Sequence, residues 1–229
     1  MNLPRFNIYT LIHKGLRASM CQNLVDLGKL DDTDPIAVAR QLETTGNLLQ
    51  FCRSHLAHEN EFIHSILQKV GDTPRQTIED HHEHEIAIAG LHDKISHILR
   101  LHGQERTQAL QEFYGVFSLF VAENFSHMRI EETVNSELLW KHFSDEQIQA
   151  IEQGIIESLS PEENLLCLIM ILPNITHSER CEFLRGFRKA VPSEAFNNTI
   201  AMLKPLLSPK EWLKLNQALF LSQPESSAA

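Results

Sequence analysis

The sequence predicts an all-α protein, in which an up-down-up-down four-helix bundle is followed by a C-terminal extension of short helices. Gly and Pro number only 9 each in 229 residues, and long stretches without either favour helices over strands and turns. Apolar residues recur at helical spacing in four long segments of the first 143 residues. Long amphipathic helices with short connections are typical of a bundle. We therefore expect a bundle domain over residues 1–143 and a helical extension over residues 144–229.

Local signals set the ends of the four long helices. Gly28 is a plausible stop for the first helix. Asp34 followed by Pro35 is a good N-cap and first residue for the second, which has a weak point at residues 44–46 where it could bend. Gly71 ends that helix, and His102 with Gly103 ends the third. The predicted bounds are Phe6–Leu27, Pro35–Val70, Arg75–Leu101 and Glu105–His142.

The extension carries its own helix signals. Ser144 with Gln147 three residues later forms a capping-box pattern, and Ser160-Pro161 opens a helix that runs to Pro173. Further short helices are expected over residues 178–190, 193–207 and 209–221, followed by the frayed tail QPESSAA. His177 falls at a helix start, where a surface or capping role is expected. We assign the extension to packing or to a protein partner, including a second copy of the chain.

Composition excludes several classes of partner. The formal net charge is −10, which argues against nucleic acid and anionic membranes as partners. The N-terminus lacks a secretory signal pattern, and no uninterrupted apolar stretch reaches the roughly 18 residues of a membrane span. Cys21, Cys52, Cys167 and Cys181 form no paired motif, which suits reduced thiols. The expectation is a soluble, cytoplasmic protein.

A histidine and a glutamate stand four residues apart in the segment FVAENFSHMRIEETVNSELLW. On a helix, His127 and Glu131 therefore share one face. Burying an imidazole and a carboxylate in an apolar stripe is costly unless both have partners, and a metal ion would satisfy both. The residues predicted to share this face are Phe113, Phe117, Phe120, Asn124, Val134 and Leu138.

The same pattern recurs along the chain. A second pair, His55 and Glu59, is flanked at helical spacing by Leu48, Cys52, Phe62 and Ile66. In the third segment, His81 and Glu85 form a further pair, and His84 shares the face of Ile88, Leu91, Ile95 and Ile98. In the first helix His13 is in register with Tyr9, Leu16 and Met20. Four histidine-bearing faces would converge in the bundle, with two carboxylates to bridge two ions and imidazoles to cap each.

The candidate metal ligands are chosen from those faces. Seven other histidines are expected to be solvated: His58, His64, His82, His92, His97, His102 and His142. Glu132 is expected to face solvent or to support a ligand. The six candidate ligands are His13, His55, Glu59, His84, His127 and Glu131.

Other metal sites fit the sequence less well. Ferritin-like proteins use Glu-x-x-His on two helices, which Glu61–His64 and Glu79–His82 match formally, but the fourth helix has no such motif. Structural zinc prefers thiolates or a compact set of four ligands. Imidazole and carboxylate ligands suit iron or manganese better.

These residues resemble the hemerythrin-like, HHE cation-binding family. The resemblance lies in IHKGLR around His13, HLAHENEFI, EHEIAIAGLHDKI around His84, and HMRIEETVNSELLW. It covers about residues 7–142, and implies a four-helix bundle around a non-haem di-iron centre. We therefore expect two iron ions, for which manganese or zinc could substitute. In that arrangement Glu59 and Glu131 would bridge the irons, and the four histidines of the candidate set would be terminal ligands.

The sequence departs from the oxygen-carrying members of that family at one position. Those carriers have two histidines four residues apart on the third helix, whereas Asp80 stands four residues before His84. The departure argues against oxygen carriage, and leaves Asp80, His81 and Glu85 as additional candidates outside the core set.

Two functional classes follow from the resemblance. The first is a protein that senses or binds O2, NO, redox state or iron at the di-iron centre. The second is an enzyme that reduces nitric oxide or peroxide, or delivers iron for iron–sulfur cluster repair. A metal-free helical scaffold is a third alternative. The expected small-molecule partner is a diatomic gas or peroxide.

Overall fold

The protein is helical almost throughout the residues that the structure, a computed structural model, describes, which are 5–220. No strand occurs in that range, so the predicted all-α class is confirmed. Within the same range, none of the helices has the length and apolar character needed to cross a bilayer. The predicted frayed tail lies outside the described residues.

The chain divides into two compact units, Met1–Ser160 and Pro161–Ala229. The sequence placed a domain boundary after residue 143, but the first unit also contains α7 (Asp145–Ser158). Helix α7 belongs there because Ile148 is fully buried in a cluster with Ile63 and Leu67. Its start has the predicted capping box, in which Ser144 and Gln147 bond each other's backbone N–H groups.

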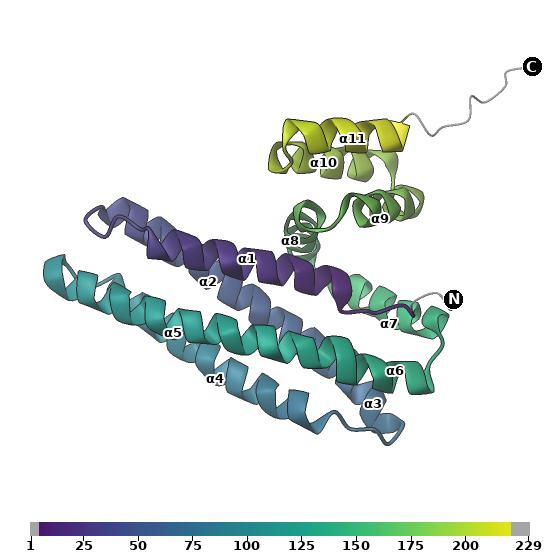
Figure 1. Cartoon of the computed structure of the whole chain (residues 1–229), viewed down its shortest axis with the longest axis horizontal. Helices are drawn as coiled ribbons and strands as arrows, with labels where there is room; N and C mark the ends of the chain where they lie inside the picture. The colour runs from purple at the N-terminus through teal and green to yellow at the C-terminus, as the bar shows by residue number, and fades with distance from the viewer. Residues whose placement is uncertain (1–4, 221–229) are drawn as a thin grey trace, which may run out of the picture. The chain divides into compact units, whose positions relative to one another are not determined.

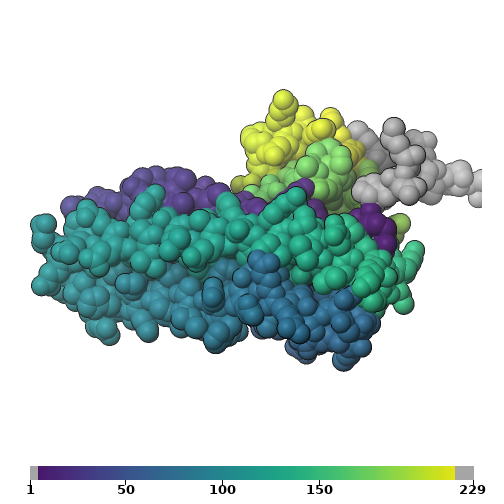
Figure 2. All heavy atoms as spheres, turned by 60° about the horizontal axis from the view of Figure 1, so that its bottom comes forward, coloured from purple at the N-terminus to yellow at the C-terminus, as the bar shows by residue number. Residues whose placement is uncertain are grey.

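Four long helices of the first unit lie side by side (Figure 1). Helix α1 contacts α2 and α5, and α4 contacts the same two helices. In Figure 2 the side chains of α4 and α5 meet along one face of this unit. The bounds are α1 (Thr10–Gly28), α2 (Pro35–His58), α4 (Arg75–Ile98) and α5 (Gly103–Ile130).

The helix ends follow the local sequence signals. The Asp34 carboxylate accepts hydrogen bonds from the backbone N–H groups of Ile36 and Ala37 at 2.8 and 3.3 Å, as expected of an N-cap before a proline. Gly71 has a φ of +86° after the second helix, a conformation that glycine adopts without strain. Residues 44–46, where the sequence suggested that the second helix could bend, are helical and lie within α2.

Two of the long helices continue through a π-helical turn. After α2 come η1 (Glu59–His64) and α3 (Ser65–Lys69), and after α5 come η2 (Glu131–Asn135) and α6 (Ser136–His142). A π turn closes i→i+5 hydrogen bonds and so contains one residue more than an α turn. Each π turn begins at one of the two glutamates of the predicted metal site.

The extra residue moves the buried face of each helix by one position. Val134 was predicted to face the core but is 51% exposed, while Asn135 is buried. On the second helix, Ile63 and Leu67 are buried, and Phe62 is only partly so. The α-helical spacing used in the sequence prediction was wrong beyond each glutamate, because it assumed a constant 3.6-residue period.

The second unit contains a set of shorter helices. Helix α9 contacts α11, and α10 contacts both α8 and α9. The buried Arg180 holds the segment before α9, since its guanidinium donates to the carbonyl oxygens of Leu172, Pro173 and Ile175. The bounds are α8 (Pro161–Ile171), η3 (Leu172–Asn174), α9 (His177–Ala190), α10 (Ser193–Leu203), η4 (Lys204–Leu206) and α11 (Pro209–Phe220).

Candidate metal centre

Two glutamates face each other in the interior of the first unit. Glu59 is the first residue of η1 and Glu131 the first residue of η2, and their exposed fractions are 2% and 0%. Both oxygens of Glu59 and the Oε2 atom of Glu131 are buried without a hydrogen-bond partner. Buried carboxylates are costly unless they are paired or bind a metal, so the surroundings of these two decide what the centre can hold.

One pair of histidines lies against one oxygen of each glutamate. The His55 Nε2 atom on α2 is 3.2 Å from Glu59 Oε1. The His13 Nε2 atom on α1 is 3.4 Å from Glu131 Oε2 and 3.7 Å from Glu59 Oε1. The two imidazole nitrogens are 3.3 Å apart. His13, His55 and Glu59 thus form one group of converging ligand atoms.

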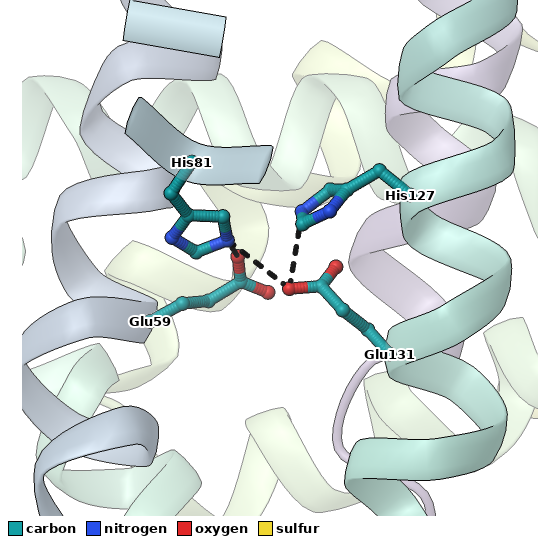
Figure 3. Close-up of side chains that lie close together, drawn as sticks. All are labelled: Glu59, His81, His127 and Glu131. Carbon is teal, nitrogen blue, oxygen red and sulfur yellow. Dashed lines mark hydrogen bonds and ion pairs between the residues drawn. The ribbon is translucent and has the colours of Figure 1, made fainter. Parts of the chain in front are cut away.

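A second pair of histidines lies against the other oxygen of each glutamate (Figure 3). The His81 Nε2 atom on α4 is 3.3 Å from Glu131 Oε1 and 3.5 Å from Glu59 Oε2. The His127 Nε2 atom on α5 is 3.2 Å from Glu131 Oε1 and has no hydrogen-bond partner. These four residues form a second, fully buried group.

The donor set is suited to a metal ion. Nitrogen and oxygen ligands lie roughly 2.0–2.2 Å from ions such as zinc, so donor atoms slightly more than 3 Å apart can share one ion. Neutral imidazole and carboxylate are ligands for iron, zinc and manganese. Three carboxylate oxygens and the His127 Nε2 atom of these groups are buried without hydrogen-bond partners. The cluster of histidines and glutamates could therefore hold a metal ion.

The outer nitrogens of three histidines are held by polar side chains. His13 Nδ1 is 3.1 Å from Glu132 Oε1, to which Arg17 also donates. His127 Nδ1 is 3.2 Å from Asp80 Oδ2. His81 Nδ1 is 2.8 Å from Asn60 Oδ1. Such contacts fix the ring orientation and raise the basicity of the inner nitrogen, so each Nε2 points at the carboxylates.

The carboxylates and histidines set each other's protonation. Burial alone would lower the pKa of His13, but the hydrogen bond to Glu132 and the nearby carboxylate of Glu59 outweigh it and raise that pKa to about 8. Burial likewise opposes the charge on His127, and Glu131 outweighs it, which raises the pKa to about 9. Burial lowers the pKa of His55 to about 4.

The two glutamates are ionised in this environment. Burial and the second carboxylate both act to raise the pKa of Glu59, but the neighbouring histidines outweigh them and lower it. The pKa of Glu131 lies well below its usual value because contacts with His127 and His81 outweigh its burial. Without a metal, the centre therefore balances anionic carboxylates against protonated imidazoles at neutral pH.

The structure brings five of the six predicted ligands into these two groups: His13, His55, Glu59, His127 and Glu131. The sixth, His84, lies beside the centre, with its ring 4.9 Å from the ring of His127 and its buried Nδ1 without a hydrogen-bond partner. The second group contains His81, whereas the sequence predicted His84 as the ligand from this helix. The helical spacing could have indicated His81, since it precedes Ile88 by seven residues on the same buried face of α4.

Two further sequence predictions about this region need correction. The third His-x-x-x-Glu pair does not form, because Glu85 is exposed. His64 was expected to be solvated, yet it is buried and its ring stacks on that of His81 at 4.6 Å. On an unbroken α-helix His64 would lie about 180° from His55, at roughly 100° per residue. The π turn rotates it inward.

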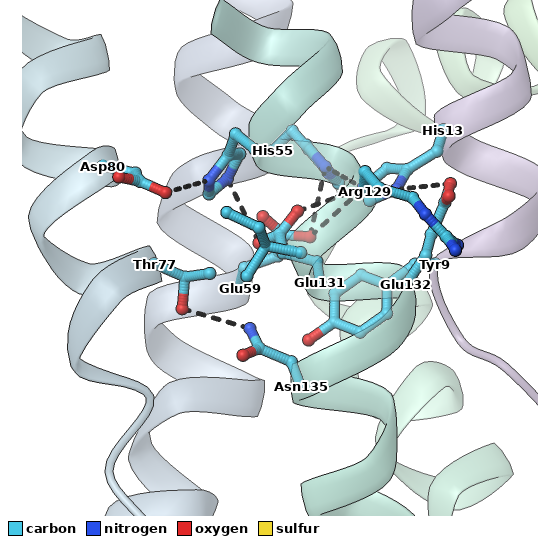
Figure 4. A network of polar contacts seen from close by, with 12 residues as sticks. Tyr9, His13, His55, Glu59, Thr77, Asp80, Arg129, Glu131, Glu132 and Asn135 are labelled. Carbon is cyan, nitrogen blue, oxygen red and sulfur yellow. Dashed lines mark hydrogen bonds and ion pairs between the residues drawn. The ribbon is translucent and has the colours of Figure 1, made fainter.

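Below the glutamates in the view of Figure 4 lies a second layer of buried polar groups. Asn135 Nδ2 donates to Thr77 Oγ1 at 3.1 Å, and the Thr77 hydroxyl donates to the Pro74 carbonyl oxygen at 3.1 Å. A hydroxyl has one proton, so His64 Nε2, 3.4 Å from Thr77 Oγ1, must be the donor in that contact. Tyr9 completes the layer, with its ring stacked on His13 at 5.3 Å.

Comparisons with known proteins add no identification. No family model, no curated protein and no solved structure matches the chain.

Proposed function

We propose that this chain is a hemerythrin-like protein that holds two iron ions in a carboxylate-bridged centre and binds or senses O2, NO or redox state there. The observation that carries the proposal is the division of the carboxylate oxygens. Each glutamate presents one oxygen to the pair His13 and His55, and the other oxygen to the pair His81 and His127. With one ion bound beside each pair of histidines, each glutamate would bridge the two ions.

The helix contacts support the bundle that this centre requires. In an up-down-up-down bundle each helix packs on its neighbours in sequence, and the fourth packs on the first. The contacts of α1 with α2, α2 with α4, α4 with α5 and α5 with α1 fit that order. Each helix would then supply one histidine, and the second and fourth would each add a glutamate.

The ligand set would be His13 and His55 for one ion, His81 and His127 for the other, and Glu59 and Glu131 for both. His84 remains a candidate for the second ion, because it lies beside His127 with an unpaired buried nitrogen. Asp80 and Glu132 would orient the histidines, not bind the ions, since their carboxylates contact the outer Nδ1 atoms. Manganese or zinc could occupy the same ligands.

Iron would supply reversible ligand binding and a change of oxidation state. The chain's own residues would hold the ions at a separation set by the bridging carboxylates. They would also exclude bulk water, since the four ligands of the second group are all buried. Phe120, whose ring lies 6.1 Å from that of His84, adds an apolar wall. Such surroundings tune redox potential and access.

Metal content and a visible absorption spectrum, with and without dithionite, test the proposal. Two irons per chain and a spectrum that changes reversibly with reduction would support it, with zinc-loaded protein as a spectroscopically silent control. Catalytic turnover of NO or peroxide would assign the centre to the enzyme class and contradict a sensor. Protein that contains no iron, manganese or zinc after metal-supplemented expression would refute the metal centre and favour a scaffold.

A further inference from the structure

Tyr9 stands next to the candidate centre although no sequence motif singled it out. It is the N-cap residue of α1, one turn before His13, and is 1% exposed. Its ring stacks on the His13 ring with an interplanar angle of 29°. Figure 4 shows the hydroxyl end of Tyr9 directed into the polar layer beside the glutamates. The residue therefore belongs to the wall of the centre on the His13 side.

The Tyr9 hydroxyl is buried without a hydrogen-bond partner. Buried hydroxyl groups nearly always have one, and leaving one unpaired is destabilising. Asn135 is the neighbouring polar side chain (Figure 4); its amide donates to Thr77 and also acts to lower the pKa of Tyr9, as a nearby donor does. The chain's own residues thus offer no acceptor for the hydroxyl proton of Tyr9.

This hydroxyl is a hydrogen-bond donor. An ordinary phenol has a pKa near 10 and is protonated at neutral pH. Burial raises the pKa of Tyr9 well above that value, and the charges of Glu131 and Glu59 raise it further. A protonated phenol at this place suits a partner that accepts a hydrogen bond.

The ion on the His13 side has the smaller set of ligands. His13, His55 and one oxygen from each glutamate lie around it, whereas His84 lies beside the four donors of the other side as a candidate fifth ligand. Non-haem iron sites built from histidine and carboxylate keep open positions for small molecules. The open position would therefore lie on the side where Tyr9 forms the wall.

We propose that the Tyr9 hydroxyl donates a hydrogen bond to a small anionic ligand bound at the ion held by His13 and His55. The inference rests on the proposed function, and it assigns to this chain a residue that selects ligands. Reduced forms of oxygen and linear anions such as azide accept hydrogen bonds from a phenol. Neutral ligands that accept hydrogen bonds weakly would gain little from it.

The test compares azide binding by the iron-loaded, oxidised full chain and its Tyr9→Phe variant. Phenylalanine keeps the ring that stacks on His13 and removes only the hydroxyl. Hydrogen bonds to charged groups are strong enough that we expect azide affinity to fall roughly tenfold or more. Tyr114→Phe is the matched control, because Tyr114 is the other tyrosine of the chain and is 40% exposed. It should bind azide like the wild type.

A second measurement compares the vibrational spectrum of bound azide in the wild type and in the Tyr9→Phe variant. The antisymmetric stretch of bound azide should shift between H2O and D2O, and the shift should vanish in the Tyr9→Phe variant. Iron content is measured first on every sample. Wild type without iron would refute the proposed function and this inference together.

Two results with full iron content would overturn the inference and leave the proposed function standing. One is unchanged azide affinity in Tyr9→Phe. The other is a visible charge-transfer band of the azide-free oxidised protein that disappears in Tyr9→Phe, because such a band would show that the phenolate itself is an iron ligand.

Discussion

Iron binding at pH 7 should release protons from the two histidines whose pKa values the carboxylates raise. A metal binds neutral imidazole, so any proton on His13 or His127 must leave first. With pKa values of about 8 and about 9, both are almost fully protonated at pH 7. His55, with a pKa of about 4, contributes none. We expect these two histidines to release about two protons per chain at pH 7 and about one at pH 8.5.

Because the metal displaces these protons, their displacement also sets the direction in which pH changes the affinity for iron. Because protons compete with the metal, affinity should fall as the pH falls, by up to about a hundredfold per pH unit where two protons are displaced. Anaerobic titration of metal-free protein with Fe(II) in weakly buffered solution with an indicator dye measures the release directly. Titration calorimetry in two buffers of different ionisation enthalpy gives an independent value.

Proton release near zero at pH 7, or proton release that grows with pH, would refute the prediction that the carboxylates keep His13 and His127 protonated. It would show that the histidines are neutral before the metal arrives. A Glu132→Gln variant is the internal check, since the hydrogen bond between Glu132 and His13 makes the largest contribution that raises the pKa of His13. On binding iron at pH 7 this variant should release fewer protons than the wild type, while the number released from His127 stays unchanged.

Three further outcomes follow from the geometry. Glu131→Ala removes a proposed bridge and should lower iron occupancy to half or less by elemental analysis. His81→Ala should lower iron affinity, whereas Glu85→Ala should leave it unchanged, because His81 contacts both glutamates and Glu85 is exposed. Metal-free protein should lose stability as the pH rises from about 6.5 to 9.5, on the order of a few kcal/mol, because raised histidine pKa values stabilise the fold only while the imidazoles are protonated.

Each outcome has a result that would contradict it. Full occupancy in Glu131→Ala would count against the bridging assignment. Equal effects of the alanine changes at His81 and Glu85 would contradict the assignment of His81, and not Glu85, to the group of metal ligands. Thermal melts of chelator-treated protein that are flat with pH, or that rise, would show that the protonated imidazoles contribute nothing to the fold.

Much of the centre could be predicted from local spacing. His55 with Glu59, and His127 with Glu131, share a helix face at a separation of four residues whatever the rest of the chain does. Asp34 and Ser144 marked helix starts by side-chain chemistry that acts within three residues. These features depend on neighbours in sequence, which is why they could be read without a structure.

The choice between His81 and His84 depends on contacts between helices. His81 and His84 lie on one face of α4, and sequence spacing cannot say which of the two meets the glutamates of other helices. Only the tertiary arrangement decides that the Nε2 atom of His81 lies against Glu59 and Glu131. His84 is displaced to the side of His127.

What the sequence by itself determined is the helical class, most helix ends and the four-residue His–Glu pairs, because these arise from interactions within a few residues of the chain. What only the tertiary structure decided is the register beyond Glu59 and Glu131. A π turn adds one residue to the helix without any repeat in the sequence to reveal it. It persists where packing between helices favours it, and here it buries His64 and Asn135 and exposes Val134.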